Sequence, residues 1–203
     1  IGVTSHRLDT ILKALRTNHF DTIQFPFNYI ENDAAQELFP LARQMDVGII
    51  VMKPIAGGVM PNPAASIRWI GSQVTDVIIP GVENTSLVDE NIRSIEAPLT
   101  AEDVTSLESI AKELGPVFCR RCGYCLPCPN GIPVSFISSA EIFFRRSGWH
   151  KLNSNHVEGF RNGVNCVQCG LCEQRCPYNL PLTRLVPEYS KRLLLRAEEL
   201  NVK

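Results

Sequence analysis

The sequence has neither a long apolar run nor an excess of charge of one sign. No apolar stretch reaches the roughly 18 residues of a membrane-spanning helix, and no stretch reads as a secretory signal peptide. The net charge is −1, whereas non-specific binding to nucleic acid needs a basic field. We therefore expect no membrane span and no nucleic-acid partner.

The bulk composition is that of an ordinary globular protein. Of the 203 residues, 44% are hydrophobic and 20% are charged, which is enough apolar material for a core. By length alone the chain forms one large or two small domains.

All eight cysteines fall in two short runs near the C-terminal end. Residues 119–129 read CRRCGYCLPCP and residues 166–177 read CVQCGLCEQRCP. The second run has the ferredoxin spacing C-x2-C-x2-C-x3-C-P, which is typical of cubane iron–sulfur ligands. The first run is one residue shorter before its last cysteine. The two runs form an internal repeat.

Two 4Fe–4S clusters are the interpretation that we favour. In two-cluster ferredoxins the fourth cysteine of each run ligates the other cluster, so each cluster takes three cysteines from one run and one from the other. Disulfides and paired zinc sites are the alternatives; a tetrahedral zinc site leaves the third regularly spaced cysteine unexplained. Thiolate clusters need a reducing compartment, for which the cytoplasm is the default. One cluster is predicted to use Cys119, Cys122, Cys125 and Cys176, and the other Cys166, Cys169, Cys172 and Cys128.

The first hundred residues alternate between apolar strands and helical patterns, which predicts a parallel α/β sheet. No G-x-G-x-x-G follows a strand, which leaves a Rossmann fold with little support. Polar residues close several strands at the end where a barrel builds its active site. A complete barrel needs about 250 residues, so we expect four βα units, the second half of a (β/α)8 TIM barrel, over 1–115. A mainly helical ferredoxin-like domain is expected over 116–203. Strands are predicted at 1–4, 22–25, 47–52 and 76–79, and helices at 8–15, 33–42, 64–70, 86–95, 101–114, 134–146 and 182–200.

Three segments of the first hundred residues read IGVTSH (1–6), VMKPIAGG (51–58) and IPGV (79–82). They resemble parts of the second half of the aldo/keto reductase family. Residues 123–132 (GYCLPCPNGI) resemble the signature of the branch that carries a C-terminal ferredoxin-like 4Fe–4S domain. The resemblance implies a barrel that binds NAD(H) or NADP(H) and transfers hydride to a small carbonyl substrate. The family's catalytic tyrosine, lysine, aspartate and histidine lie on its first four strands, so no catalytic residue is expected in this chain, which alone would be inactive.

The resemblance also implies a set of nicotinamide contacts. The aromatic residue that usually stacks on the nicotinamide is replaced by Met52 and Lys53, and Glu83 favours a ribose hydroxyl over a phosphate. Plainer roles exist: Thr4 and Ser5 as helix caps, Gln24 as a satisfied interior group, and the glycine pair as a tight turn. The cofactor-binding residues implied are Thr4, Ser5, Gln24, Lys53, Gly57, Gly58, Gly81, Glu90 and Asn91.

The sequence therefore predicts an iron–sulfur oxidoreductase whose clusters exchange electrons with a redox protein partner. The alternative is an electron-transfer or structural 4Fe–4S module on a barrel scaffold without carbonyl reductase activity. A Schiff-base role for Lys53, as in lyase barrels, is a further alternative.

Overall fold

A computed structural model describes residues 1–115 and 117–202. The chain divides into two compact units, Ile1–Pro116 and Val117–Lys203, and each is described by itself.

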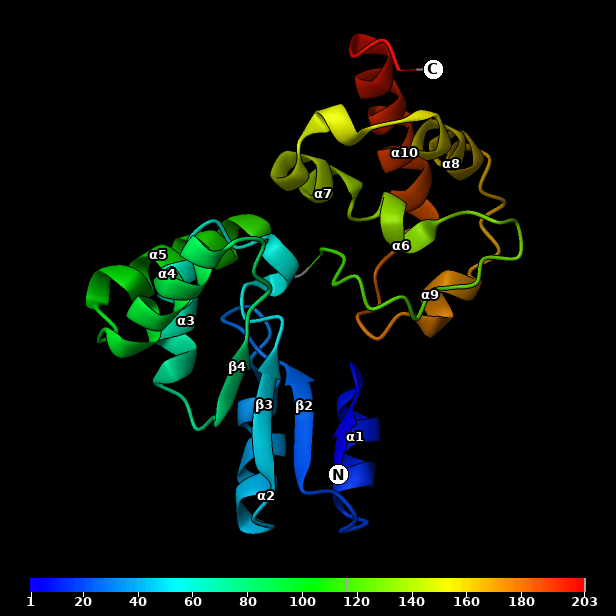
Figure 1. The fold of residues 1–203 in the computed structure, drawn as a ribbon. Coiled ribbons are helices and arrows are strands. Elements are labelled where there is room, and N and C mark those ends of the chain that lie inside the picture. Colours follow the sequence, from blue (N-terminus) through cyan, green and yellow to red (C-terminus); the bar gives the residue numbers. More distant parts are fainter. Residues whose placement is uncertain (116, 203) are drawn as a thin grey trace. The chain divides into compact units, whose positions relative to one another are not determined.

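The first unit is built on a four-stranded parallel sheet with the order β1-β2-β3-β4 (Figure 1). A helix follows each strand, so the predicted four βα units of a half TIM barrel are confirmed. The strands are β1 (Gly2–Thr4), β2 (Thr22–Pro26), β3 (Gly48–Met52) and β4 (Val77–Ile79), and the helices are α1 (Leu8–Leu15), α2 (Leu38–Gln44), α3 (Pro63–Gly71) and α4 (Thr85–Glu96).

The core of this unit lies where α1 and α2 pack on one face of β2 and β3. Alternate strand residues point to that face, and Ile23 and Ile49 are both fully buried there. Phe27, just past β2, packs its ring 4.8 Å from that of Phe39 and 5.2 Å from that of Trp69. The hydrophobic effect on this one face therefore holds the strand ends in place.

A continuous helix predicted over 33–42 is wrong. The structure has a short 3₁₀ helix, η1 (Asp33–Ala35), and then α2. A helix through this stretch would place Pro40 in its interior, where the missing N–H and the ring oppose helical bonding. Starting α2 at Leu38 puts Pro40 in the first turn, where proline is tolerated. Ala34 rather than Ala35 is buried as a result.

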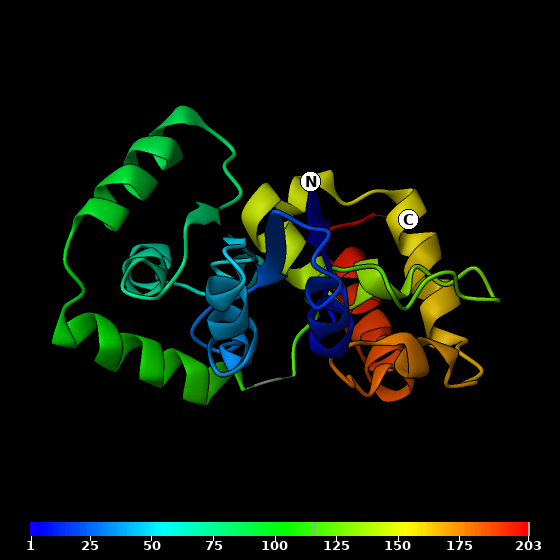
Figure 2. The same ribbon diagram turned by 90° about the horizontal axis from the view of Figure 1, so that it is seen from below.

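Three further helices of this unit begin at side-chain caps. Asn62 caps α3 and Asn84 caps α4 through bonds to the backbone N–H three residues on. α5 (Ala101–Leu114) begins with a capping box, in which Thr100 and Asp103 bond each other's backbone N–H. Viewed from below, α4 and α5 flank α3 (Figure 2).

Every regular element among the described residues of the second unit is a helix. The predicted helix over 134–146 is wrong as one element, because it breaks between α6 and α7. The hydroxyls of Ser138 and Ser139 donate to the carbonyls of Val134 and Ser135, and such back-bonding competes with regular helix. α10 begins before Pro187 and continues through it. The elements are α6 (Val134–Ile137), α7 (Ala140–Ser147), η3 (Trp149–Lys151), α8 (Ser154–Val164), α9 (Leu171–Arg175) and α10 (Leu182–Glu199).

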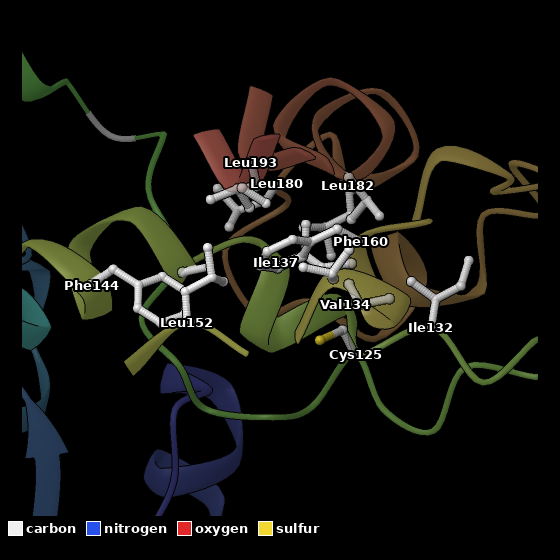
Figure 3. Close-up of a cluster of buried hydrophobic side chains, with 14 of the residues drawn as sticks. Cys125, Ile132, Val134, Ile137, Phe144, Leu152, Phe160, Leu180, Leu182 and Leu193 are labelled. Carbon is white, nitrogen blue, oxygen red and sulfur yellow. The ribbon is translucent and has the colours of Figure 1, made fainter. Parts of the chain in front are cut away.

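The core of the second unit joins α6, α8 and α10. Ile137, Phe160 and Leu182 are almost completely buried in it. Cys125 lies at the edge of this cluster, beside Val134 (Figure 3), so one cysteine run is anchored to the helical core. Within the described part of the chain, no helix has the length and apolar character needed to cross a membrane.

Candidate functional site

The two cysteine runs repeat each other in backbone conformation as well as in sequence. The residue before the second cysteine is left-handed in both, with φ of 55° at Arg121 and 54° at Gln168. The glycine after that cysteine also matches, with φ of 78° at Gly123 and 79° at Gly170. A β-carbon would strain this conformation, so glycine is the residue that this turn requires.

One group of thiols gathers around Cys125. Burial, together with the nearby thiolates of Cys119, Cys122 and Cys176, raises the pKa of Cys125 to about 12. Burial also raises the pKa of Cys119. The backbone N–H of Arg121 donates to the Cys119 sulfur at 3.4 Å, and this bond lowers the same pKa in part. Three of these thiols come from the first run and one, Cys176, from the second.

A second group lines a small hollow between the runs. Burial raises the pKa of Cys172, and the neighbouring Cys166 adds to the shift. Arg175 on α9 donates a 2.8 Å hydrogen bond to the carbonyl of Pro127, which holds the runs together here. The cysteines on this hollow are Cys128, Cys166, Cys169 and Cys172, together with Cys125.

The grouping is crosswise, and the donor chemistry fits an iron–sulfur cluster at each group. Four thiols are the ligand set of a 4Fe–4S cluster, and each must lose its proton to bind metal. Among residues 1–115 and 117–202, no three His, Cys, Asp or Glu side chains are placed to hold one metal ion. The ligand assignment therefore rests on the spacing and on this grouping, and it remains a prediction.

The residues expected around the nicotinamide meet at the carboxyl edge of the sheet. Thr4 pairs with Gln24 in the β1–β2 register. The Thr4 hydroxyl donates to the Gln24 carbonyl at 3.0 Å, and the Gln24 amide nitrogen lies 3.5 Å from the sulfur of Met52. Ser5 is buried, and its hydroxyl accepts from the N–H of Arg7. The hydroxyls of Thr4 and Ser5 thus both take part in the fold itself.

The loop after β3 is wound tightly. Lys53, Ala56, Gly57 and Gly58 all have positive φ, and a side chain at either glycine would strain the backbone. The N–H of Gly58 donates to the carbonyl of Ile55 at 2.8 Å. Gly57 and Gly58 therefore form a tight turn, and the backbone N–H of Gly58 is already hydrogen-bonded within that turn.

The predicted adenosine-side residues lie around α4. Asn91 lines an open hollow of about 390 Å³ between α3, β4 and α4. Glu90 is exposed on the same helix, and its carbonyl accepts from the Ser94 hydroxyl. Gly81 is exposed, and a β-carbon there would meet nothing within 4 Å. Among these three residues, only Asn91 lines the hollow.

Two residues matter more in the structure than the sequence indicated. Asn28 is fully buried and joins two loops: its amide donates to Glu31 and to the Lys53 carbonyl, while its oxygen accepts from the N–H of Ile30 and Glu31. Arg120 is buried beside Cys119, although arginine is mostly exposed in proteins. Its ring partner Tyr178 is distant in the sequence, so no local signal indicated this burial.

Comparison with protein families gives a match within the second unit. Residues 118–180 match the 4Fe–4S dicluster domain. The predicted 4Fe–4S domain is thereby confirmed, and the match spans both cysteine runs. The C component of the ion-translocating oxidoreductase complex of Buchnera aphidicola subsp. Acyrthosiphon pisum (strain APS) is 31% identical over 67 residues, which are 32% of this chain and 12% of that protein.

The solved structures found are aldo-keto reductases, the family that the sequence resembles. The holo form of aldo-keto reductase AKR11C1 from Bacillus halodurans is 19% identical, with a TM-score of 0.44 over 54% of this chain and 49% of that one. The apo form gives 20% identity and a TM-score of 0.42, over 54% and 50%. The chain thus spans about half the length of these reductases and a small part of the Buchnera protein.

Proposed function

We propose that this chain carries two 4Fe–4S clusters in its dicluster domain and belongs to a nicotinamide-dependent oxidoreductase. The observation that supports the proposal is that Cys176 of the second run lies near Cys125 of the first, while Cys128 of the first run lines a hollow with Cys166, Cys169 and Cys172 of the second. The clusters supply one-electron transfer, and the cysteines hold them in place. Such clusters are suited to a reducing compartment such as the cytoplasm. The proposed ligands are Cys119, Cys122, Cys125 and Cys176 for one cluster, and Cys128, Cys166, Cys169 and Cys172 for the other.

The first test of this proposal is the metal content of the anaerobically purified chain. We expect about eight irons and eight sulfides per chain. Cys169→Ser, at the most exposed of these cysteines, is expected to lower the iron content toward about four per chain, because its own cluster loses a ligand. Ser139→Ala is the matched control and should leave the iron unchanged. Stoichiometric zinc, or wild-type protein with only half of the expected iron, would reject the two-cluster proposal.

For the first unit we propose nicotinamide binding at the carboxyl edge of the sheet, with hydride transfer to a small carbonyl substrate by the whole protein. Parallel sheets bind ligands at this edge. Gln24 is half-buried there with its amide beside Met52, a position from which it can orient a carboxamide. Glu83 favours NAD(H), while NADP(H) stays open.

A second candidate is a cluster module whose barrel half binds no nicotinamide. The bonds that Thr4, Ser5 and Gly58 already make within the fold favour it. A hydride carries two electrons and a cubane cluster passes one, so direct coupling also needs an electron-splitting centre. In this candidate the clusters serve electron transfer or structure alone.

NADH binding separates the two candidates. The first predicts that the anaerobic chain changes NADH fluorescence, and that Gln24→Ala weakens binding by about tenfold, the value of one hydrogen bond. Gln36→Ala, at an exposed glutamine of the same unit, is the control. A redox titration of the clusters with and without nicotinamide then tests coupling. Absence of NADH binding by an iron-loaded chain would favour the second candidate.

The charge of the dicluster unit suggests the chemistry of a redox partner. Residues 117–203 contain twelve Lys and Arg and six Asp and Glu, a net charge of +6, whereas residues 1–116 carry −7. A basic surface steers acidic proteins toward it. We therefore propose an acidic electron-transfer protein as the partner of the clusters.

A further inference from the structure

Arg120 is a buried cation in the first cysteine run. Only 4% of its surface is exposed, which is unusual for arginine. Its guanidinium carbon lies 3.7 Å from the ring centre of Phe118 and 4.4 Å from that of Tyr178. One guanidinium nitrogen donates to the carbonyl of Phe118 at 2.5 Å. Two aromatic rings and this hydrogen bond hold the charge in a fixed place.

This cation sits between the two segments that supply one proposed cluster. Arg120 follows Cys119 directly, and Tyr178 lies two residues after Cys176. The ring contacts therefore join the first-run and second-run ligands of the same thiol group. Water is largely excluded from Arg120, so salt and solvent screen its charge far less than that of a surface arginine.

The repeat places no cation at the position of the second run that matches Arg120. Position 120 of the first run corresponds to Val167 of the second, which is uncharged and 66% exposed. Phe118 corresponds to Asn165, and Tyr178 to Asn130. The aromatic and cationic arrangement is thus specific to one of the two groups. That group also contains the two buried cysteines, Cys125 and Cys176.

We propose that the positive charge of Arg120 raises the reduction potential of one cluster above that of the other. The cluster affected is the one held by Cys119, Cys122, Cys125 and Cys176. This inference rests on the clusters of the proposed function. Hydrogen bonding, burial and nearby charge are the means by which a protein sets such a potential.

The electron balance determines the direction of the effect. A cluster accepts one electron from a one-electron donor, which is oxidised by one electron, and the cluster with its thiolates becomes more negative by one charge. A fixed positive charge stabilises this reduced state more than the oxidised state. An electron that reaches the cluster pair therefore rests preferentially on the cluster beside Arg120.

An anaerobic redox titration of the whole chain, with dithionite as reductant and electron paramagnetic resonance as readout, tests the proposal. The wild type is expected to show two separate one-electron steps. Arg120→Gln should lower only the higher step, by about tenfold in the equilibrium constant of reduction, which is about 59 mV for one electron. Arg121→Gln removes an equal charge one residue away, but this side chain is exposed, and we expect a change of about twofold or less.

Equal shifts in the two variants, or an unchanged potential in Arg120→Gln with its full iron, would overturn the proposal. If Arg120→Gln does not retain its iron, Arg120→Lys decides: it keeps the charge and should stay within about twofold of wild type. A fall as large as about tenfold in Arg120→Lys would contradict a role for the charge. In the wild type itself, two clusters that titrate at one potential would also contradict it. Absence of iron from the wild type would instead reject the proposed function.

Discussion

At the scale of single residues, the Asp103 carboxylate of the first unit accepts hydrogen bonds from two residues. It accepts two hydrogen bonds from Arg68, at 2.8 and 2.5 Å, and also bonds the N–H and hydroxyl of Thr100. The side chain is only 8% exposed. One carboxylate therefore caps α5 and joins it to α3.

We expect Asp103→Asn to lower the free energy of unfolding of the first unit by about 3 kcal/mol, because Arg68 loses its buried partner. Urea unfolding followed by Trp69 fluorescence, in a background with Trp149 replaced by Phe, measures it. Glu37→Gln, in the exposed pair with Arg16, is the control and should change stability by about 0.5 kcal/mol or less.

The same pair predicts a pH dependence. Arg68 holds the pKa of Asp103 well below its ordinary value of 3.8. A depressed carboxyl pKa gives stability that is present above the ordinary value and is lost as the pH falls toward the folded-state value. The difference between wild type and Asp103→Asn should therefore be constant above about pH 5 and shrink below about pH 4. A difference that stays independent of pH down to about 2 would contradict the ion-pair explanation.

At the scale of elements, the close approach of α8 and α10 depends on Gly163. A β-carbon there would overlap the hydroxyl oxygen of Ser190 and lie 2.7 Å from a methyl carbon of Ile137. Both neighbours are buried in the helical core. Overpacking of this kind costs about 1–3 kcal/mol, whereas glycine to alanine within a helix gains up to about 1 kcal/mol.

We therefore expect Gly163→Ala to destabilise the second unit by about 1 kcal/mol net. A lower Tm of the anaerobic iron-loaded protein, followed by circular dichroism, would show it. Asn162→Ala, at the exposed neighbouring position, should be neutral or slightly stabilising. Equal or higher stability of Gly163→Ala would mean that α8 and α10 can separate at little cost.

The elements that the sequence predicted well are those with strong local patterns. The β3 run from Gly48 and the capping box at Thr100 each carry their own signal. α8 was missed because its eleven residues include two glycines and two asparagines, which have low helix propensity. Its buried Phe160 and Val157 show that tertiary packing stabilises it. His156 closes a capping box with Asn153 and stacks on Phe136.

The 4Fe–4S domain could be predicted for a similar reason, since the spacing of cysteines along a short loop is a local property. The assignment of individual cysteines to each cluster follows the ferredoxin pattern and stays a prediction. The burial of Arg120 could not be predicted, because it depends on Tyr178, which lies far along the sequence. The nicotinamide contacts were inferred from resemblance alone, and the bonds made by Thr4 and Gly58 became visible only in three dimensions.

At the scale of the whole molecule, a near-neutral total charge conceals two oppositely charged parts. The net charge of −1 sums a strongly acidic first unit and a strongly basic second one. The expectation of no non-specific nucleic-acid binding rested on the total. The charge of each unit is the relevant quantity for steering a partner to it.

The crosswise grouping has one more consequence for the second unit. On the proposed ligand sets, one cluster ties Cys128 to Cys166, and the other ties Cys119 to Cys176, so the first closed loop is nested inside the second. Each cluster then acts as a cross-link that restricts the unfolded chain, as a disulfide does. Both closed loops contain α6, α7 and α8, so both cross-links restrict this part of the unfolded chain. Loss of one cluster would thus remove one of the two cross-links. On this proposal the clusters stabilise the folded second unit in addition to carrying electrons.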